Sequence, residues 1–347
     1  MGRWDYIIVG QGLAGSCLAI ELLKRNKSFL VIDKPQPNSA SRVAAGLFNP
    51  ITGRTMKPTW MADKIFSALK EFYGQAEKTF NKKFLHLLPI YRPFIAPAEQ
   101  IQWTKETSLW VSGVFSKAQY PEMIHNPFGG AELTGSGFLN TGVFLEAVRE
   151  MISDIGNLME EVFDYQELMM SENVQYKNAV ASCIIFCDGV DANANPWFCW
   201  APVIKLKGET LVIKTSLPRD IIVNRGIFSV PAEESPDTFF VGSTYSRDAS
   251  PGNTPAGLEE LVIKAKKVFK NDFEILSQNW GHRPTTIDRR PLLGTHPRHK
   301  NICFFNGLGT KGVSLAPFFA VHLADWLDGK TELNKEVNIE RYYSLYF

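Results

Sequence analysis

The chain has 347 residues, of which 45% are hydrophobic and 12% aromatic, enough to bury a large core and form two domains. Its 37 basic residues nearly balance 36 acidic residues, so a net charge of +1 excludes a general field that attracts nucleic acid or an anionic membrane. The five cysteines lack metal-type spacing, and we expect free thiols in a reducing compartment.

The sequence also argues against a metal centre and a membrane span. The six histidines show no metal-binding spacing, and we expect His296 and His299 to be solvated loop residues. No apolar run reaches the roughly 18 residues that cross a membrane. Because the first strand begins close to the N-terminus, we expect no signal peptide and a cytoplasmic location.

The first predicted strand, Tyr6-Ile7-Ile8-Val9, runs directly into Gly10-Gln11-Gly12-Leu13-Ala14-Gly15 and an apolar helix pattern. This order is typical of a dinucleotide-binding turn. The three glycines allow the sharp turn, the approach of a pyrophosphate, and close packing of helix on strand. The helix N-terminus then offers free N–H groups to the phosphates. A second strand, 29–32, delivers Asp33, whose carboxylate suits the hydroxyls of an unphosphorylated ribose.

After the second strand the sequence contains a stretch of small residues, a helix and several short aromatic segments. Small residues between Ser41 and Pro50 allow a flat ring to approach the backbone, and Ser41 and Arg42 are placed to meet a pyrophosphate. An amphipathic helix is predicted over 61–80. Short aromatic pieces at 87–94, 108–114 and Gln119-Tyr120, broken by prolines, predict strands of an antiparallel sheet.

From here to the end of the chain, segments with the strand–helix pattern of the N-terminal part alternate with segments that predict antiparallel strands. A helix is predicted over 141–155, a strand over 161–163, and an apolar strand over 181–187 that ends in Asp188-Gly189. Further strands are predicted at 203–215, 220–223 and 238–241, then a helix over 257–269. A final strand and helix unit spans 302–328, with its helix over 318–327.

This alternation predicts an α/β fold. A Rossmann-like cofactor domain with a parallel central sheet is interleaved with a second, mainly antiparallel α+β substrate domain. We assign 1–84, 135–202 and 280–347 to the first domain, and 85–134 and 203–279 to the second.

A late glycine-rich segment resembles a second cofactor cradle. It reads Asn306-Gly307-Leu308-Gly309-Thr310-Lys311-Gly312 between a strand and a helix, so another helix N-terminus faces a ligand. Such a cradle suits the electron-rich ring of a flavin. A glycine-rich turn without a ligand is the alternative interpretation.

Several motifs in this order resemble the FAD-dependent D-amino-acid oxidase superfamily, in particular its glycine oxidase and sarcosine oxidase group. They are the two glycine turns, the 41–50 stretch, Lys207-Gly208-Glu209, Val241-Gly242-Ser243-Thr244, and Gly281-His282-Arg283-Pro284 with Asp288 and 291–294. The 45–50 pattern and the late glycine-rich segment also resemble the flavin half of the bifunctional bacterial enzyme that modifies the tRNA wobble uridine.

The resemblance implies an FAD-dependent oxidoreductase that oxidises the C–N bond of an amino acid or another carboxylate-bearing amine by hydride transfer to flavin N5. Oxygen or another acceptor would reoxidise the flavin. The cysteine that tethers the flavin covalently in monomeric sarcosine oxidases has no counterpart near 283–290, which implies non-covalent FAD. Neither strong nucleic-acid binding nor a membrane span is expected. The alternatives are a flavin oxidoreductase of the tRNA-modification type, a noncatalytic flavin-binding module and an NAD-dependent dehydrogenase.

Substrate residues follow from the same resemblance. Arg283 matches the arginine that holds the substrate carboxylate, and a salt bridge to Asp288 is its alternative role. Lys311 matches a carboxylate-binding lysine or neutralises reduced flavin. Arg54 falls near another carboxylate-binding arginine. The residues Trp60, Tyr91 and Arg92 are pocket or core candidates.

The chain departs from the family at one substrate position. Phe228 replaces a tyrosine whose hydroxyl binds the carboxylate in glycine oxidases, which argues against glycine as substrate; Tyr245 is a substitute. The residues that we assign to the cofactor site are Gly10, Gly12, Leu13, Ala14, Gly15, Asp33, Lys34, Ser41, Arg42, Ala44, Ala45, Gly46, Val162, Asp188, Gly189, Gly307, Leu308, Gly309, Thr310, Lys311 and Gly312.

Overall fold

The computed structural model describes residues 2–52, 57–105, 109–233 and 235–347. Within these ranges the chain forms two sheets of eight strands, a sheet of three strands and seven α-helices. The helices are α1 (Leu13–Lys24), α2 (Ala40–Val43), α3 (Ala62–Phe80), α4 (Pro97–Lys105), α5 (Thr141–Asp154), α6 (Pro255–Val268) and α7 (Gly312–Leu327).

Sheet A is a mixed sheet that contains a parallel core and antiparallel pairs at its margins. Its strands are β1 (Gly2–Val9), β2 (Phe29–Ile32), β9 (Leu158–Met159), β10 (Leu168–Met170), β11 (Val174–Tyr176), β12 (Ala179–Phe186), β18 (Leu292–Thr295) and β19 (Ile302–Asn306). β12 pairs in parallel with β1 on one side and with β19 on the other, and β2 lies beyond β1. The first and last strands of this parallel core are therefore separated by a single strand.

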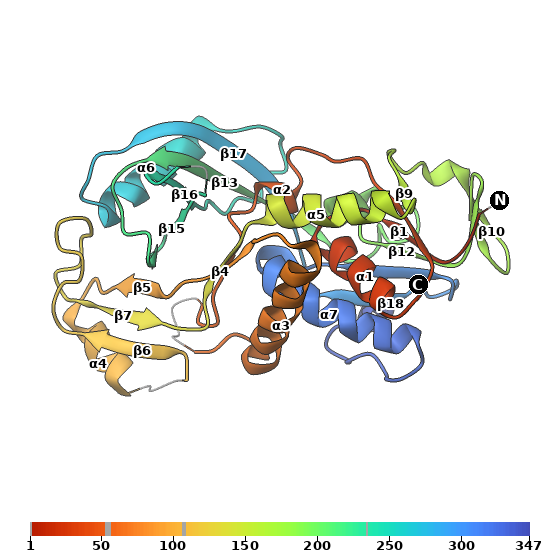
Figure 1. Ribbon diagram of the computed structural model, residues 1–347, viewed down its shortest axis with the longest axis horizontal. Helices are drawn as coiled ribbons and strands as arrows, with labels where there is room; N and C mark the ends of the chain where they lie inside the picture. Colours follow the sequence, from red (N-terminus) through yellow and green to blue (C-terminus); the bar gives the residue numbers. More distant parts are fainter. Residues whose placement is uncertain (1, 53–56, 106–108, 234) are drawn as a thin grey trace.

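Helices α1 and α7, which follow β1 and β19, pack against each other on one face of sheet A (Figure 1). Because the strands run in parallel, their carboxyl ends meet at one edge, where both helices begin. The outer helix α3 packs on α7 through apolar residues at helical spacing. These are Ala62, Ile65, Phe66, Leu69, Phe72, Tyr73 and Ala76.

Sheet B is the mainly antiparallel sheet of the other half of the molecule. Its strands are β5 (Ile90–Pro93), β6 (Val111–Phe115), β7 (Gly130–Leu133), β13 (Ile204–Lys214), β14 (Ile222–Asn224), β15 (Phe228–Pro231), β16 (Thr238–Gly242) and β17 (Glu274–Thr285). The long strands β13 and β17 pair over 204–214 and 274–285. Helix α6 covers one face of the sheet and buries Leu261 and Ala265 there.

A small sheet C, of β3 (Leu47–Phe48), β4 (Leu85–Leu87) and β8 (Gly137–Leu139), and the short helix α2 connect the two halves. Helix α2 lies so close to β17 that a Cβ at Gly281 would be 2.5 Å from Val43 Cγ2. Ser39 forms a bridge with His282. The segment before β3 is therefore fixed between the parallel sheet and the antiparallel sheet.

These observations confirm the predicted α/β class. The strands of sheet B lie in segments that we assign to the substrate domain, except for the end of β17, which runs past residue 279; the division into domains stays a prediction. None of the described helices combines the length and the apolarity that a membrane crossing needs. Four of the five cysteines are buried free thiols, and Cys199 is exposed.

Four local predictions were wrong. Residues 161–163 form no strand, because β9 takes the pairing with β2 and Val162 is exposed. Gln119-Tyr120 is a bend, since Tyr120 has a φ of 53°. His296 is buried against Phe198 rather than solvated. The last helix begins at Gly312 and includes Pro317, whereas the prediction placed its start after that proline.

One hydrogen bond explains how α7 tolerates Pro317. Proline has no N–H for the carbonyl of Val313, four residues earlier. The Tyr73 hydroxyl of α3 donates to this carbonyl at 3.0 Å, and both groups are buried. The Val313 carbonyl would otherwise be buried without a hydrogen-bond donor, and α3 supplies that donor through Tyr73.

A Tyr73→Phe variant should lose about 1–2 kcal/mol of unfolding free energy, because the carbonyl remains buried without a donor. Chemical denaturation followed by circular dichroism measures this loss. Tyr245→Phe, at an exposed position, serves as the matched control and should leave stability unchanged. Equal stability of the two variants would contradict the role of the Tyr73 hydroxyl.

Candidate active site

A cavity of about 2150 Å³ lies at the carboxyl edge of sheet A and extends to sheet B. It exceeds the roughly 300–1,000 Å³ of an ordinary ligand pocket. Every residue that we assign to the cofactor site lines it except Gly15. The cavity is therefore large enough for an extended cofactor and a substrate side by side.

The first glycine turn has the geometry that its sequence predicts. Gly10 has a φ of 96°, and a Cβ there would lie 2.6 Å from the carbonyl oxygen of Cys187. A Cβ at Gly15 would lie 2.0 Å from the Gly10 carbonyl, so this glycine permits helix–strand packing rather than ligand contact. Gly12 caps α1, whose first turn contains no acidic residue. The helix N-terminus is thus open to an anion.

The segment from Ser41 to Gly46 forms the next wall of the cavity. Ser41 Oγ accepts a hydrogen bond from the Leu13 amide at 3.1 Å, and Arg42 pairs with Glu146 at 2.8 Å. Gly46 has a φ of 72°, and a Cβ there would lie 1.8 Å from the Leu139 carbonyl oxygen. Only glycine fits this position, so the wall stays small and close to sheet C.

Asp33, which follows β2, also lines the cavity. Its carboxylate accepts hydrogen bonds from the Gln11 amide at 2.9 Å and from Arg149 Nη1 at 3.0 Å. Arg149 also pairs with Glu160 at 2.9 Å. Since a carboxylate accepts about four hydrogen bonds, Asp33 can still accept hydrogen bonds from the hydroxyls of a ribose. Arg149 was missed by the sequence reasoning, because nothing in its helix pattern indicates the distant partner.

The second glycine turn meets the first. Gly307 and Gly309 have φ values of 74° and 58°, and a short 3-10 turn leads into α7 at Gly312. A Cβ at Gly312 would lie 3.2 Å from Leu13 Cδ1, so turns about 300 residues apart are in contact. The first turn of α7 also contains no acidic residue.

Asp188 joins the two turns. It follows β12, and its Cα lies 3.4 Å from a Cβ placed at Gly10. Its carboxylate accepts hydrogen bonds from Asn306 Nδ2 and Asn195 Nδ2, both at 2.9 Å. Asn306 Oδ1 in turn accepts from the Gly307 amide at 2.7 Å. Burial raises the pKa of the Asp188 carboxyl to about 7, against the lowering effect of the two amides.

These features fit FAD. Two helix N-termini without acidic residues face one cavity, where they suit the phosphates and the electron-rich edge of a flavin ring. The small residues Ala44, Ala45 and Gly46 line the wall where a flat ring would lie. No cluster of His, Cys, Asp and Glu in the described ranges is arranged to hold a metal ion.

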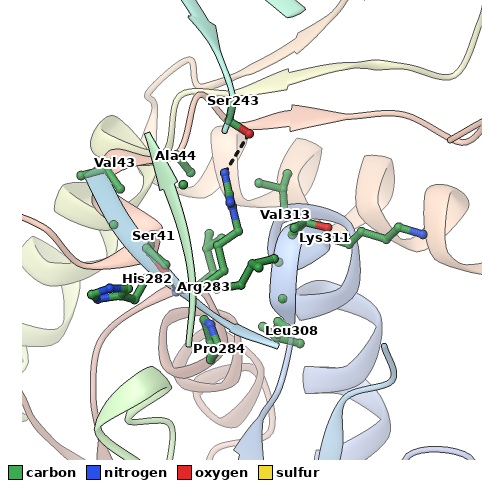
Figure 2. A pocket seen from close by; sticks show the side chains of 18 of the residues that line it. Ser41, Val43, Ala44, Ser243, His282, Arg283, Pro284, Leu308, Lys311 and Val313 are labelled. Carbon is green, nitrogen blue, oxygen red and sulfur yellow. Dashed lines mark hydrogen bonds between the residues drawn. The ribbon is translucent and has the colours of Figure 1, made fainter. Parts of the chain in front are cut away.

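Arg283 enters the cavity from β17. Figure 2 shows its guanidinium pointing to Ser243, whose Oγ accepts a hydrogen bond from Nη2 at 2.8 Å. Nη1 donates to the carbonyls of Thr244 and Lys207 at 3.3 and 3.5 Å. The Tyr245 ring lies 5.0 Å from the guanidinium carbon. Burial lowers the pKa of Arg283, and Tyr245 opposes this shift.

The guanidinium occupies space that only a glycine leaves free. A Cβ at Gly208, on the adjacent strand β13, would lie 2.0 Å from Arg283 Nη2. The expected alternative, a salt bridge to Asp288, is wrong, since Asp288 pairs with Arg341 at 3.0 Å. No carboxylate of the described residues lies within ion-pair distance of Arg283.

The remaining substrate candidates differ in whether their side chains face the cavity. Phe228 and Tyr245 line the cavity. The backbone of Lys311 lines it as well, but the side chain points away from Arg283 (Figure 2) and donates to Thr59 Oγ1. Burial, with Arg290 and Arg289 nearby, lowers the pKa of Lys311. Arg54 lies outside the described residues.

Of the three pocket or core candidates, Arg92 lines the cavity and the other two do not. Tyr91 is buried in the core under sheet B and accepts a hydrogen bond from Asn126 at 2.7 Å. Trp60 stacks on Phe319 with ring centroids 5.7 Å apart.

Comparison with known proteins decides the family. The model of the DAO family, described as FAD dependent oxidoreductase, matches residues 5–326. The chain belongs to this family. Among curated proteins it is 25% identical to the bifunctional protein ThiO/ThiG of Trichormus variabilis, over 93% of this chain and 52% of that protein. The chain thus spans about half the length of the first relatives. It is also 22% identical to the glycine oxidase of Geobacillus kaustophilus, over 94% of both.

Solved structures share the fold. The glycine oxidase of Geobacillus kaustophilus has a TM-score of 0.78 at 20% identity, covering 96% of both chains. An L-proline dehydrogenase from P. horikoshii has a TM-score of 0.79 at 15% identity, covering 99% of this chain and 98% of that one. The family assignment makes FAD the cofactor of this fold and removes the support for the NAD-dependent alternative.

The Asp188 carboxyl should make stability depend on pH. Because the pKa of about 7 in the folded protein lies above the 3.8 of an ordinary aspartate, the native state holds a proton that the unfolded state releases. This contribution to stability is complete below the unfolded pKa and declines by a few kcal/mol as pH rises from about 4 to about 7. In Asp188→Asn the unfolding free energy should decline less between these pH values. Urea unfolding at a series of pH values measures this decline. Identical pH slopes in the two proteins would contradict this protonation.

Gly208→Ala should displace the Arg283 guanidinium, because the new methyl group needs its space. We expect carboxylate affinity to fall at least about tenfold, a loss of about 1.4 kcal/mol, while FAD affinity is retained. Titration of the FAD-loaded protein with a carboxylate ligand measures the first quantity, and fluorescence of released flavin measures the second. Gly74→Ala, at an open helix position, is the control. Unchanged carboxylate affinity would contradict the tight placement of Arg283.

Proposed function

We propose that the chain oxidises the C–N bond of an amino acid or another amine that carries a carboxylate, with hydride transfer to N5 of bound FAD. The observation that carries this proposal is Arg283, a partly buried cation in the cofactor cavity whose described partners are neutral oxygens. Burying a charge without a counter-ion is costly. A substrate carboxylate would supply the missing negative charge, and a guanidinium binds it through two parallel hydrogen bonds.

The surrounding residues would hold this guanidinium ready for the substrate. Ser243 Oγ and the Thr244 carbonyl fix it from β16 and the following residues, and the Tyr245 ring covers one face. These contacts limit its rotation, so little conformational freedom is lost when a carboxylate binds. Bound FAD supplies the hydride acceptor, while the protein orients the amine and excludes water.

The residues at the two glycine turns would hold the cofactor. Gly10 and Gly12 would admit the pyrophosphate at the start of α1, and Asp33 would accept from the ribose. The start of α7, at Gly309 to Gly312, would face the flavin ring, where its N–H groups favour the negative charge of the reduced form. The Lys311 side chain is directed to Thr59, so its contribution to carboxylate binding requires a different rotamer.

The substrate that we propose is larger than glycine. Phe228 lines the cavity next to β16 and brings no hydroxyl for a carboxylate. The cavity is also larger than a flavin and a small amino acid require. We propose oxygen or another acceptor for reoxidation of the flavin, and a cytoplasmic location.

Arg283→Ala should weaken transition-state binding of carboxylate substrates by about 2–4 kcal/mol, because it removes a desolvated ion pair. The rate of flavin bleaching near 450 nm without oxygen, in a screen of amino acids and amines, measures this effect. Arg3→Ala, at an exposed position, is the matched control. Wild-type bleaching rates in Arg283→Ala would remove this residue from the site, and no bleaching by any amine would overturn the proposed function.

A further inference from the structure

A buried arginine lies behind the wall of the cavity that carries Asp33. Arg149, in the second half of α5, does not line the cavity, whereas Gln11 and Asp33 do. Its Nη1 donates to Gln11 Oε1 at 3.2 Å and to Asp33 Oδ2 at 3.0 Å. Its Nη2 donates to Glu160 at 2.9 Å and to the Asp33 carbonyl at 3.5 Å. One side chain thus joins the first glycine turn, the end of β2 and the segment after β9.

The packing of α5 explains how Arg149 reaches these three segments. α5 contacts α1 and the short α2, and the chain then enters β9, which pairs in parallel with β2 (Figure 1). The Asp33 amide donates to the Met159 carbonyl at 3.1 Å, so β2 and β9 end side by side. Gln11 Nε2 donates to the Leu145 carbonyl at 2.9 Å and fixes α5 to the glycine turn.

These contacts fix the direction of the Asp33 carboxylate. Among the described residues, Oδ1 accepts from the Gln11 amide at 2.9 Å and Oδ2 accepts from Arg149. Each oxygen of a carboxylate accepts about two hydrogen bonds, so each keeps a further acceptor site. A ribose presents two neighbouring hydroxyl donors, and a carboxylate held in this way offers one acceptor site to each of them.

Arg149 also supplies a charge that the cofactor end of the cavity needs. We expect the pyrophosphate at Gly10 and Gly12, and a carboxylate close to it raises the electrostatic cost of binding. Arg149 offsets the charge of Asp33 from the side away from the cavity, so the acceptor sites stay open. The second carboxylate on Arg149, that of Glu160, has a side chain that is 63% exposed, and water screens its charge.

The pair with Glu160 extends the same arrangement to the other side of the cavity wall. Glu160 is followed by Val162 and Phe163, which both line the cavity. Val162 is 64% exposed there. An apolar side chain that is left exposed in a cavity suits the flat face of a nucleobase. Arg149 therefore fixes two neighbouring segments, one with acceptors for a ribose and one with an apolar surface for a base.

Stability alone is a weak reason for this arrangement. A desolvated ion pair adds little to stability compared with apolar residues of similar volume, because both charges lose hydration. What the pair of Arg149 with Asp33 does provide is one fixed orientation of the carboxylate.

We propose that Arg149 is a positioning residue for the adenosine half of FAD. It does not touch the cofactor. It holds Asp33 toward the ribose and residues 160–163 toward the adenine. In this way it gives the chain its preference for FAD over FMN, which carries the same ring and one phosphate but no adenosine.

Titration of the FAD-free, full-length chain with FAD and with FMN, followed by flavin fluorescence, tests this inference. Arg149→Gln should weaken FAD binding about tenfold, because Asp33 loses a charged donor, and should leave FMN binding unchanged. ADP carries the adenosine without the ring, and it should compete with FAD less well in this variant. Asp154→Asn, an exposed position at the end of the same helix, is the control and should behave as wild type.

A double-mutant cycle separates positioning from a general structural role. Since Arg149 acts through Asp33, the losses of FAD affinity in Arg149→Gln and Asp33→Asn should not add in the double variant. Arg149→Lys keeps the charge without the planar fork, so it should retain part of the FAD affinity. This variant replaces Arg149→Gln in both tests if circular dichroism shows that the glutamine variant does not fold.

Three results would overturn the inference. Equal losses of FAD and FMN affinity would assign Arg149 to the general fold of the domain. Wild-type binding of FAD and ADP in Arg149→Gln would remove the residue from cofactor recognition. Additive losses in the double variant would show that Arg149 does not act through Asp33.

Discussion

The parallel pairing of β12 with β1 on one side and β19 on the other is the constraint on which the site depends. It places the ends of two strands from opposite parts of the chain at one edge of sheet A. Each strand is followed by a glycine turn and a helix, so both helix N-termini open into one cavity. The approach of Gly312 to Leu13 and the hydrogen bond between Asp188 and Asn306 fix the distance between the turns.

The polar chemistry of the cavity centres on Arg283, a cation whose partners among the described residues are neutral oxygens. The guanidinium of Arg283 donates to Ser243 Oγ and to the carbonyls of Thr244 and Lys207. This arrangement costs free energy until an anion binds, because a partly buried charge has lost much of its hydration. An anionic ligand recovers this free energy when it binds. Affinity and orientation thus come from charges already fixed by sheet B, while the redox chemistry belongs to the cofactor.

Parts of this site could be predicted from the sequence because they depend on local backbone requirements. Positive φ values and close approach demand glycine at Gly10 and Gly307, and each glycine follows a strand that is itself predictable. The resemblance to a known family added Arg283, whose role as a carboxylate ligand stays a prediction. The α/β class and the interleaved sheets were predicted for the same reasons.

The rest depends on packing between distant segments, which no local pattern encodes. The pairing of Asp33 with Arg149, and the side chain of Lys311 directed to Thr59, are set by how elements pack. The predicted strand at 161–163 failed for a related reason, since a two-residue strand just before it had already paired with β2.

The most direct test of this account is a crystal structure of the protein with FAD and an unreactive carboxylate. We predict that the pyrophosphate lies at Gly10 and Gly12, that the flavin ring lies between the 44–46 wall and the start of α7, and that the carboxylate binds Arg283. A flavin ring that contacts only one of the two glycine turns, or a carboxylate bound away from Arg283, would contradict the account.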